Sequence, residues 1–229
     1  MVKQVKRLSY YCPFGMSIRS TRYHQPRIQV RFLMPHLVKG INMHILFLNG
    51  PPRSGKDTIA DYLVMKGYKK MKFAEVIFYD LQNILGLTDE QLSLYREEKK
   101  DDHLLFDTTL RKMAINYSEK VVIPRHGEHY WSKILLEKMR NYDYKSAGKL
   151  GNNIVVSDLG FEREYEFFEK NLRFPYEQFT VIRVERKGCS YANDSREYVK
   201  SYDHVIKNNG SLELLYEEIE KLQKLYKGN

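Results

Sequence analysis

The stretch Gly50-Pro51-Pro52-Arg53-Ser54-Gly55-Lys56-Asp57-Thr58 constrains the fold of this chain more than any other part of its sequence. It follows an apolar run, 44–49, and precedes a segment, 59–64, whose apolar residues have helical spacing. A strand, a loop with the pattern G-x-x-x-x-G-K and a helix in this order are typical of a phosphate-binding loop. Glycine lets the backbone approach a phosphate, the helix N-terminus adds partial positive charge, and the lysine reaches the phosphate oxygens.

One position departs from the standard pattern. The residue after the lysine is normally Ser or Thr, whose hydroxyl binds Mg²⁺. Here it is Asp57, and Thr58 comes one place later. The departure leaves open how a metal would be held, but it does not weaken the prediction of phosphate binding. The alternative is a strand-turn-helix connection that contains two glycines and a lysine by coincidence.

Length and cysteine usage limit the class of protein. A chain of 229 residues suits one α/β domain with small insertions. Cys12 and Cys189 show no metal-ligand spacing, so we expect free thiols in a reducing compartment, the cytoplasm, or the host cytoplasm if the source is viral. No apolar run reaches membrane-spanning length, and we expect no membrane partner.

The net charge of +9 is concentrated in the first segment. Residues 1–42 hold eight basic and no acidic residues, which leaves 30 basic against 29 acidic residues, a net charge of +1, for residues 43–229. Residues 1–42 could be a basic arm for nucleic acid, a targeting peptide, or an extension upstream of a natural start at Met43. We favour the extension, and predict the core domain over residues 43–229.

From Met43 onward, strands and helices alternate, which predicts a mainly parallel sheet covered on both faces. Helices are expected over 57–66, 74–85, 108–120, 129–141 and 161–171, a short one is expected to begin at Asn193-Asp194-Ser195, and the last follows Ser211. Strands are expected over 44–49, 69–73, 154–158, 180–186 and 204–208.

Several polar residues stand out as candidates for a ligand site. Arg111 lies in the first turn of its helix, where a cation opposes the helix dipole, although a merely exposed arginine is an equal alternative. Trp131 follows Arg125 and two histidines; it could belong to the core, but its charged neighbours favour a ring at a cleft edge that could stack on a base. His126 and His129 lack a third ligand at a plausible spacing, so no zinc site is expected. Asp158 ends a buried strand, where it could orient Mg²⁺, bind a substrate, or cap the helix 161–171.

Taken in order, these features resemble the deoxynucleoside monophosphate kinases of bacteriophages, which belong to the P-loop kinase superfamily. The resemblance covers residues 43–229. It rests on the loop with Asp after its lysine, on Arg111, on Tyr130-Trp131, on Val156-Ser157-Asp158-Leu159 with Phe161 and Glu164, and on the tail Val205-Ile206-x-Asn208-x-Gly210-Ser211-Leu212.

Two positions depart from the family pattern. The family often has Arg two residues after the strand-end Asp, where this chain has Gly160, and Arg163 is a candidate to replace it. The segment Asp194-Ser195-Arg196-Glu197 has Arg where the family has His. Both departures concern contacts to the substrate and the lid.

The resemblance implies a P-loop NTPase three-layer α/β fold with a helical substrate-binding or lid insertion. It also implies transfer of the ATP γ-phosphoryl group to a deoxynucleoside 5′-monophosphate with Mg²⁺. ATP would be bound by Gly50, Arg53, Ser54, Gly55, Lys56, Asp57 and Thr58, and the metal by Asp57 and Thr58. Lys56, Arg53, Arg111 and Asp158 would be catalytic. The monophosphate would contact Arg111, Arg125, Trp131, Asp158, Arg163 and Glu164.

Two other functions remain open at this point. One is a different small-molecule P-loop kinase, acting for instance on phosphomevalonate or dephospho-coenzyme A. The other is a nucleic-acid-associated ATPase that uses residues 1–42, against which the nearly neutral charge of the remainder argues. The sequence also leaves open whether the protein forms a homodimer.

Overall fold

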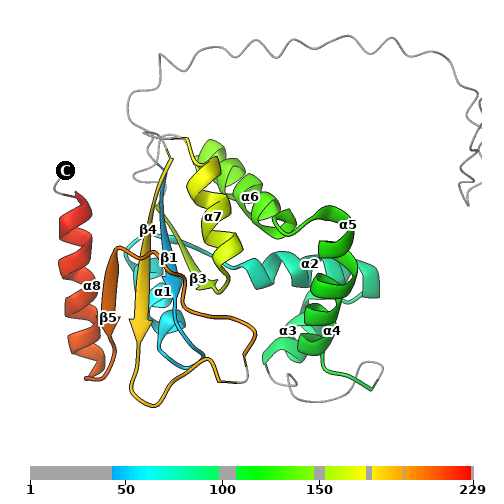
Figure 1. Ribbon diagram of the computed structural model, residues 1–229, viewed down its shortest axis with the longest axis horizontal. Helices are drawn as coiled ribbons and strands as arrows, with labels where there is room; N and C mark the ends of the chain where they lie inside the picture. Colours follow the sequence, from blue (N-terminus) through cyan, green and yellow to red (C-terminus); the bar gives the residue numbers. More distant parts are fainter. Residues whose placement is uncertain (1–42, 98–106, 147–152, 174–176, 193, 228–229) are drawn as a thin grey trace, which may run out of the picture. The chain divides into compact units, whose positions relative to one another are not determined.

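The computed structural model describes residues 43–97, 107–146, 153–173, 177–192 and 194–227, and the predicted extension, 1–42, lies outside these ranges. Within them, five strands form one parallel sheet in the order β2-β3-β1-β4-β5 (Figure 1). β1 is central and pairs in parallel with β3 and β4, while β2 and β5 are the edge strands. The strands are β1 (Met43–Asn49), β2 (Lys69–Met71), β3 (Asn153–Leu159), β4 (Glu177–Glu185) and β5 (His204–Lys207).

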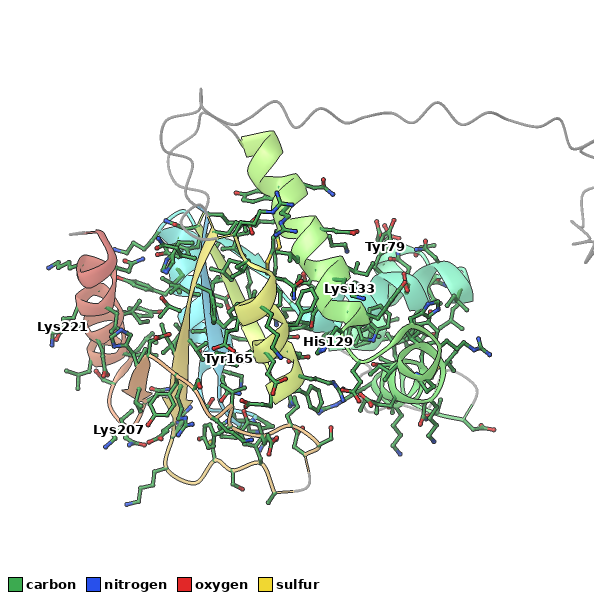
Figure 2. All side chains as sticks on the ribbon, turned by 45° about the horizontal axis from the view of Figure 1, so that its top comes forward. Tyr79, His129, Lys133, Tyr165, Lys207 and Lys221 are labelled. Carbon is green, nitrogen blue, oxygen red and sulfur yellow. The ribbon has the colours of Figure 1, made fainter. Side chains whose placement is uncertain are left out.

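Helices cover both faces of the sheet because successive strand residues point to opposite sides and both sets are apolar. Phe47 belongs to the core on the side of α6 and α7, whereas Leu48 belongs to the core with α1 and α8. Side chains fill the space on both faces (Figure 2). These four helices are α1 (Lys56–Met65), α6 (Tyr130–Ser146), α7 (Glu162–Asn171) and α8 (Leu212–Lys227). The predicted three-layer α/β fold with a parallel sheet is confirmed.

A helical insertion separates β2 from β3 in the chain and lies beside the layered body (Figure 1). It has a small core of its own, with Leu81, Leu110 and Ala114 at its centre. The helices of the insertion are α2 (Phe73–Leu85), α3 (Asp89–Glu97), α4 (Leu110–Tyr117), the π-helix η1 (Ser118–Val122) and α5 (Ile123–His126). α3 begins with a capping box, since the Thr88 hydroxyl accepts from the Gln91 amide and the Gln91 side chain accepts from the Thr88 amide.

The expected uninterrupted helix over 108–120 is only partly correct. The α-helical hydrogen bonding ends at Tyr117, and a π-helical turn follows. The hydroxyl of Ser118, the first residue of that turn, is buried and accepts a hydrogen bond of 2.9 Å from the indole nitrogen of Trp131. This tertiary contact anchors the turn to α6. No helix in the described ranges is both long and apolar enough to cross a membrane.

Candidate functional site: a phosphate-binding loop and the loop above it

The phosphate loop connects β1 to α1 at the carboxyl end of the sheet, as the sequence predicts. Gly55 is the residue before the helix and has φ 103°, a backbone conformation that glycine adopts without strain. Arg53, with φ 65°, is also left-handed, and its side chain is exposed. The helix therefore begins at Lys56 with its first N–H groups directed toward the loop, which is the arrangement that binds anions.

Lys56 is folded into the loop. Its ammonium group donates to the carbonyl oxygens of Gly50 and Pro51, at 2.6 and 2.7 Å, and the residue is only 9% exposed. Burial, and next the positive charge of Arg196, lower the pKa of Lys56 to about 8. An anion within reach of this ammonium group would favour its charged form, so the site is suited to phosphate.

Both glycines of the loop are packed against other segments. A side chain on Gly55 would collide with the amide of Asn208, which follows β5, and one on Gly50 would collide with the carbonyl of Val184. Asn208 also donates a hydrogen bond of 2.8 Å to the Ser54 carbonyl. The Ser54 hydroxyl is buried, and among the described residues it has no hydrogen-bond partner, so it can donate to a phosphate oxygen.

Asp57 faces β2. Its carboxylate lies 2.6 Å from the Lys72 ammonium and 3.2 Å from that of Lys70, and it accepts a hydrogen bond of 3.0 Å from Ser157. Burial alone would raise the pKa of Asp57, but the two lysines outweigh it and lower the pKa to about 2. Two ammonium groups already neutralise this carboxylate, which argues against its predicted role as a Mg²⁺ ligand.

No cluster of three or more His, Cys, Asp or Glu side chains suited to a metal occurs among the described residues. The second predicted ligand, Thr58, is half-buried in the first turn of α1 and stays a prediction. Mg²⁺ often keeps several waters and binds mainly through substrate phosphates, so it can arrive with its nucleotide.

Asp158 caps a helix, but not the helix that the sequence suggested. Its two carboxylate oxygens accept from the backbone amides of Phe73 and Ala74, both at 2.9 Å, and so cap the N-terminus of α2. Burial raises the pKa of Asp158 despite these hydrogen bonds. Phe73, which was expected to end β2, begins α2 instead, because its amide is bound by this carboxylate.

Glu164 closes the N-terminus of its own helix, α7. One carboxylate oxygen accepts from the amides of Gly160 and Phe161, at 2.9 and 3.1 Å. Burial raises the pKa of Glu164 to about 8, and the nearby Asp158 acts in the same direction. Two acids therefore share the end of β3, and at neutral pH Glu164 is largely protonated.

The predicted substrate arginines lie on three different helices. Arg111 on α4 and Arg125 on α5 are exposed. Arg111 is close enough to the loop between β4 and β5 that its charge helps Arg196 to lower the pKa of Asp194 to about 2. Arg163 instead pairs with Glu119 of η1 at 2.9 Å and lies over the ring of Phe161.

Trp131 does not lie where the sequence suggested. Its side chain is part of the core, is 6% exposed, and donates to Ser118. The expectation of a ring at a cleft edge is therefore wrong, because the indole is needed to hold η1 against α6. A base could not stack on this ring without opening the core.

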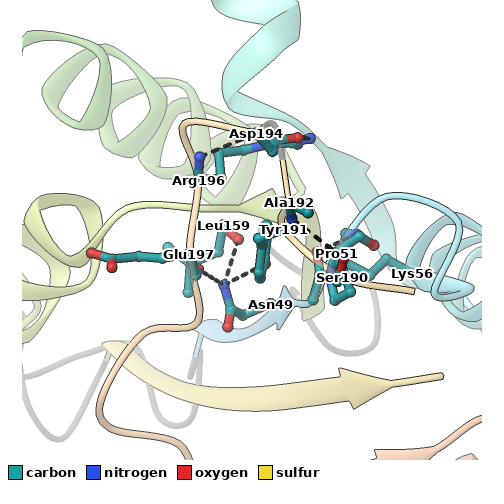
Figure 3. Close-up of polar contacts among 11 residues, drawn as sticks. Asn49, Pro51, Lys56, Leu159, Ser190, Tyr191, Ala192, Asp194, Arg196 and Glu197 are labelled. Carbon is teal, nitrogen blue, oxygen red and sulfur yellow. Dashed lines mark hydrogen bonds and ion pairs between the residues drawn. The ribbon is translucent and has the colours of Figure 1, made fainter. Parts of the chain in front are cut away.

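The loop between β4 and β5, which contains the segment Asp194 to Glu197, lies over the end of β1 (Figure 3). The fully buried amide of Asn49 donates to the carbonyls of Leu159 and Glu197, both at 3.0 Å, and to the Tyr191 hydroxyl at 3.3 Å; it accepts from the Val199 amide. Asn49 thus fixes this loop above β1 and β3. An Asn at a strand end in an otherwise apolar run was the available signal.

Arg196 is the basic residue that this loop brings to the site. The short helix expected from Asn193 is not found, since Asp194 to Arg196 are not helical and Asn193 lies outside the described residues. The Arg196 guanidinium instead binds Asp194 through two nitrogens, at 2.9 and 2.5 Å. Its side chain, and not that of Arg163, lies against Gly160.

No protein-family model matches the sequence. The chain is similar to a protein of Acanthamoeba polyphaga mimivirus named "Putative deoxynucleotide monophosphate kinase", with 26% identity over 199 residues, which are 77% of this chain and 94% of the relative.

The chain is also similar to two solved structures of kinases. One is a dephospho-CoA kinase from Campylobacter jejuni, with TM-score 0.46 and 19% identity, covering 82% of this chain and 99% of that chain. Another is the Mycobacterium tuberculosis APS kinase CysC in complex with AMPPNP and APS, with TM-score 0.41 and 13% identity, covering 80% of this chain and 99% of that chain. The predicted resemblance to nucleotide kinases agrees with the name of the mimivirus protein.

Proposed function

We propose that this protein transfers the γ-phosphoryl group of ATP to the 5′-phosphate of a deoxynucleoside monophosphate. The observation that carries the proposal is the loop 50–58 at the carboxyl end of a parallel sheet, with Lys56 folded into it at a helix N-terminus. The class of acceptor is supported by the similarity to the mimivirus protein, which spans 94% of that relative.

Within this proposal, the loop binds the ATP phosphates. Phosphoryl transfer requires in-line positioning and neutralisation of the charge on the transferred oxygens, with little acid-base chemistry. Lys56, the first N–H groups of α1 and the Ser54 hydroxyl supply donors from one side. Arg53, exposed at the outer turn of the loop, adds a cation that can close over the phosphates.

The acceptor would bind between this loop and the helical insertion. Arg111 and Arg125 are exposed cations on the insertion and are suited to hold the acceptor phosphate against repulsion from ATP. Asp158 at the end of β3 and Glu164 in the first turn of α7 are the acids that we propose to contact a sugar or base of the acceptor. Arg163 and its partner Glu119 join α7 to η1 and so set the distance between the two sides.

Mg²⁺ would enter as the ion bound to ATP, where it neutralises phosphate charge. The cations of the chain would then neutralise the remaining phosphate charge. The carboxylate of Asp57 is not needed for the ion, since it is paired with Lys70 and Lys72. Thr58 is the loop residue that we propose as a protein ligand to that ion.

A panel of phosphoryl acceptors, with ADP release as the readout, tests the proposal. It should contain the deoxynucleoside monophosphates, dephospho-coenzyme A, phosphomevalonate and a sample with DNA alone. Turnover with one or more deoxynucleoside monophosphates, lost in Lys56→Ala while the thermal melting curve is kept, is the expected result. Turnover only with another acceptor, or only with DNA, would contradict it.

A further inference from the structure

Asp57 joins the phosphate loop to the start of the helical insertion. It is the second residue of α1 and follows Lys56 directly. Its carboxylate lies 2.6 Å from the ammonium group of Lys72, the residue that precedes α2. The ion pair therefore connects the segment proposed to bind ATP with the segment proposed to bind the acceptor.

The direction of this carboxylate is fixed by a second contact. The hydroxyl of Ser157, a residue that is 2% exposed, donates a hydrogen bond of 3.0 Å to the same oxygen of Asp57 that faces Lys72. Because β3 holds this hydroxyl inside the sheet, the carboxylate is directed toward the start of the insertion.

On the side of the insertion, α2 carries the position of Lys72 away from the sheet (Figure 1). The start of α2 is held by Asp158 of β3, which caps it, and by the ion pair with α1. Further along, Leu81 of α2 shares the small core of the insertion with Leu110 of α4. Arg111, the cation proposed above for the acceptor phosphate, follows Leu110 directly. Rigid helices transmit a displacement, so a shift at Lys72 reaches Arg111.

On the side of the loop, phosphate binding has to change the contacts of the residue next to Asp57. The Lys56 ammonium donates to the carbonyl oxygens of Gly50 and Pro51, at 2.6 and 2.7 Å. To reach a phosphate oxygen it has to leave these carbonyls, and the phosphate also takes up N–H groups of the first turn of α1. Asp57 belongs to that turn, so its carboxylate follows a shift of the loop.

The pair between Asp57 and Lys72 adds little to the stability of the fold. The Asp57 side chain is 63% exposed, although that of Lys72 is only 22% exposed. Ion pairs in contact with solvent are weak contributors to stability. Removal of the pair is therefore expected to keep the fold, so that an effect on ligand binding can be measured by itself.

On the basis of the proposed function, we propose that Asp57 and Lys72 form a link through which ATP binding at the loop raises the affinity for the acceptor. Asp57 is then a positioning residue that acts through Lys72 and α2, and neither side chain has to touch the acceptor. Because coupling between two ligands is reciprocal, the acceptor raises the affinity for ATP by the same factor.

Calorimetric titrations of the full chain with the acceptor, with and without a non-hydrolysable ATP analogue at saturating Mg²⁺, measure this coupling. The acceptor is the deoxynucleoside monophosphate with the highest turnover in the panel. In the wild type the analogue should tighten acceptor binding about five- to tenfold, at the low end of typical couplings. Lys72→Met keeps the length of the side chain without its charge, and should reduce this factor to less than about two.

Variants of the same pair and of another pair on α1 serve as controls. Asp57→Asn should reduce the coupling as Lys72→Met does, and the double variant should reduce it no further, because both changes remove one interaction. Lys72→Arg keeps the charge and should restore the coupling. Lys66→Met is the matched control: it removes a lysine paired at 2.8 Å with Glu220, which joins α1 to α8 and not to the insertion, and should keep the wild-type factor.

Two results would overturn the link. One is a wild-type chain whose affinity for the acceptor does not change with the analogue. The other is a Lys72→Met variant that binds the acceptor more weakly, or as before, but keeps the wild-type factor between the two titrations. That result would leave the pair with a structural role only. Thermal melting shows whether each variant keeps the fold, and Asp57→Asn provides the test if Lys72→Met does not.

The proposed function and this inference can fail separately. If turnover occurs only with another acceptor of the panel, such as dephospho-coenzyme A, the acceptor assignment fails, and the same titrations with that acceptor test the link. If monophosphates are phosphorylated and Lys72→Met keeps the coupling, the inference fails alone. Absence of ATP binding by the wild-type chain would overturn both.

Discussion

Lys56 is the residue of the loop whose charge changes near physiological pH. Its pKa is lowered to about 8, so in the free protein the ammonium group becomes neutral as the pH rises through that value. A neutral amine loses its attraction for phosphate. Because bound phosphate favours the ammonium form, the pKa of Lys56 must rise on binding, and the complex must take up protons near pH 8.

We therefore predict that ATP affinity falls between pH 7 and pH 9 and that binding at pH 8 takes up protons. Titration calorimetry in two buffers with different ionisation enthalpies measures this uptake directly. Glu164 also titrates near pH 8, so the same titrations on Glu164→Gln provide the control. Proton uptake that disappears in Glu164→Gln would assign the effect to the carboxyl group and not to Lys56.

A separate prediction concerns the contribution of Glu164 to the free energy of unfolding. Its pKa in the folded protein is raised to about 8, above the ordinary value of 4.5, so between these values the folded state binds more protons than the unfolded state. Its contribution to stability is full below pH 4.5 and is lost as the pH rises through 8. Glu164→Gln should keep the helix cap, and should make the decline in the free energy of unfolding from pH 5 to pH 8 smaller by on the order of 1–3 kcal/mol. Urea unfolding at the two pH values checks this, and an unchanged decline would contradict it.

Gly55 and Gly67 provide a matched pair of substitutions in the loop and at the end of α1. Both have left-handed backbone, with φ 103° and 93°, but only Gly55 lies against another residue, Asn208. Gly67→Ala should cost about 1–2 kcal/mol of stability through backbone strain alone, with normal ATP affinity. Gly55→Ala adds the collision with Asn208 and should abolish ATP binding. Melting curves and ATP titrations of the two variants separate strain from contact, and equal ATP affinity would contradict the prediction.

Two polar contacts position α1 and α2 at the edge of the sheet. Asp158 at the end of β3 caps α2, and Asp57 in the first turn of α1 pairs with Lys72 just before α2. These contacts connect the phosphate loop to the helical insertion. A carboxylate used in this way does not have to bind a metal.

Asp57→Ser tests which of these roles the carboxylate has. Since Lys70 and Lys72 neutralise it, we expect the Mg²⁺ concentration for half-maximal turnover to be unchanged in the variant. Turnover is measured over a Mg²⁺ series at saturating ATP, with Thr58→Val as the comparison, because Thr58 is the remaining predicted ligand. A large increase in the Mg²⁺ requirement of Asp57→Ser would restore Asp57 as a metal ligand.

The parts of the fold that follow from local pattern were predictable from the sequence. The loop 50–58 has both its signature and its flanking strand and helix, and the alternation of apolar segments predicts a parallel sheet. The contacts that complete the site depend on tertiary position. The expected place of Trp131 at a cleft edge was wrong because its hydrogen-bond partner, Ser118, lies in a π-helical turn. No sequence pattern predicts that turn or its contact with the indole.

The position of Arg196 also depends on tertiary contacts. A short helix was expected from Asn193, whereas contacts with Asn49 and Gly160 hold Asp194 to Glu197 over the ends of β1 and β3 without helical structure. Likewise, Asp158 is at the predicted strand end, but the helix it caps begins 85 positions earlier. Long-range polar pairing of this kind cannot be derived from one sequence.

At the scale of the whole molecule, the net positive charge and the described hydrophobic core lie in different parts of the chain. Residues 1–42 hold nearly all of the net positive charge, whereas the described core begins at Met43, whose side chain is 2% exposed beneath the sheet helices. The three core clusters described above are formed by residues of the part that the structure describes, within 43–227. The remaining net charge of +1 gives this part no general attraction for nucleic acid.

Removal of residues 1–42 is therefore expected to leave both the fold and the proposed activity intact. A chain that starts at Met43 should show the melting temperature of the full chain within a few degrees, because the core and the phosphate site are kept. Turnover with deoxynucleoside monophosphates should be unchanged. Any binding of DNA by the full chain should fall steeply with salt and be lost on truncation, since it would come from the eight basic residues that are removed. Loss of turnover in the shortened chain at an unchanged melting temperature would show that residues 1–42 take part in the site.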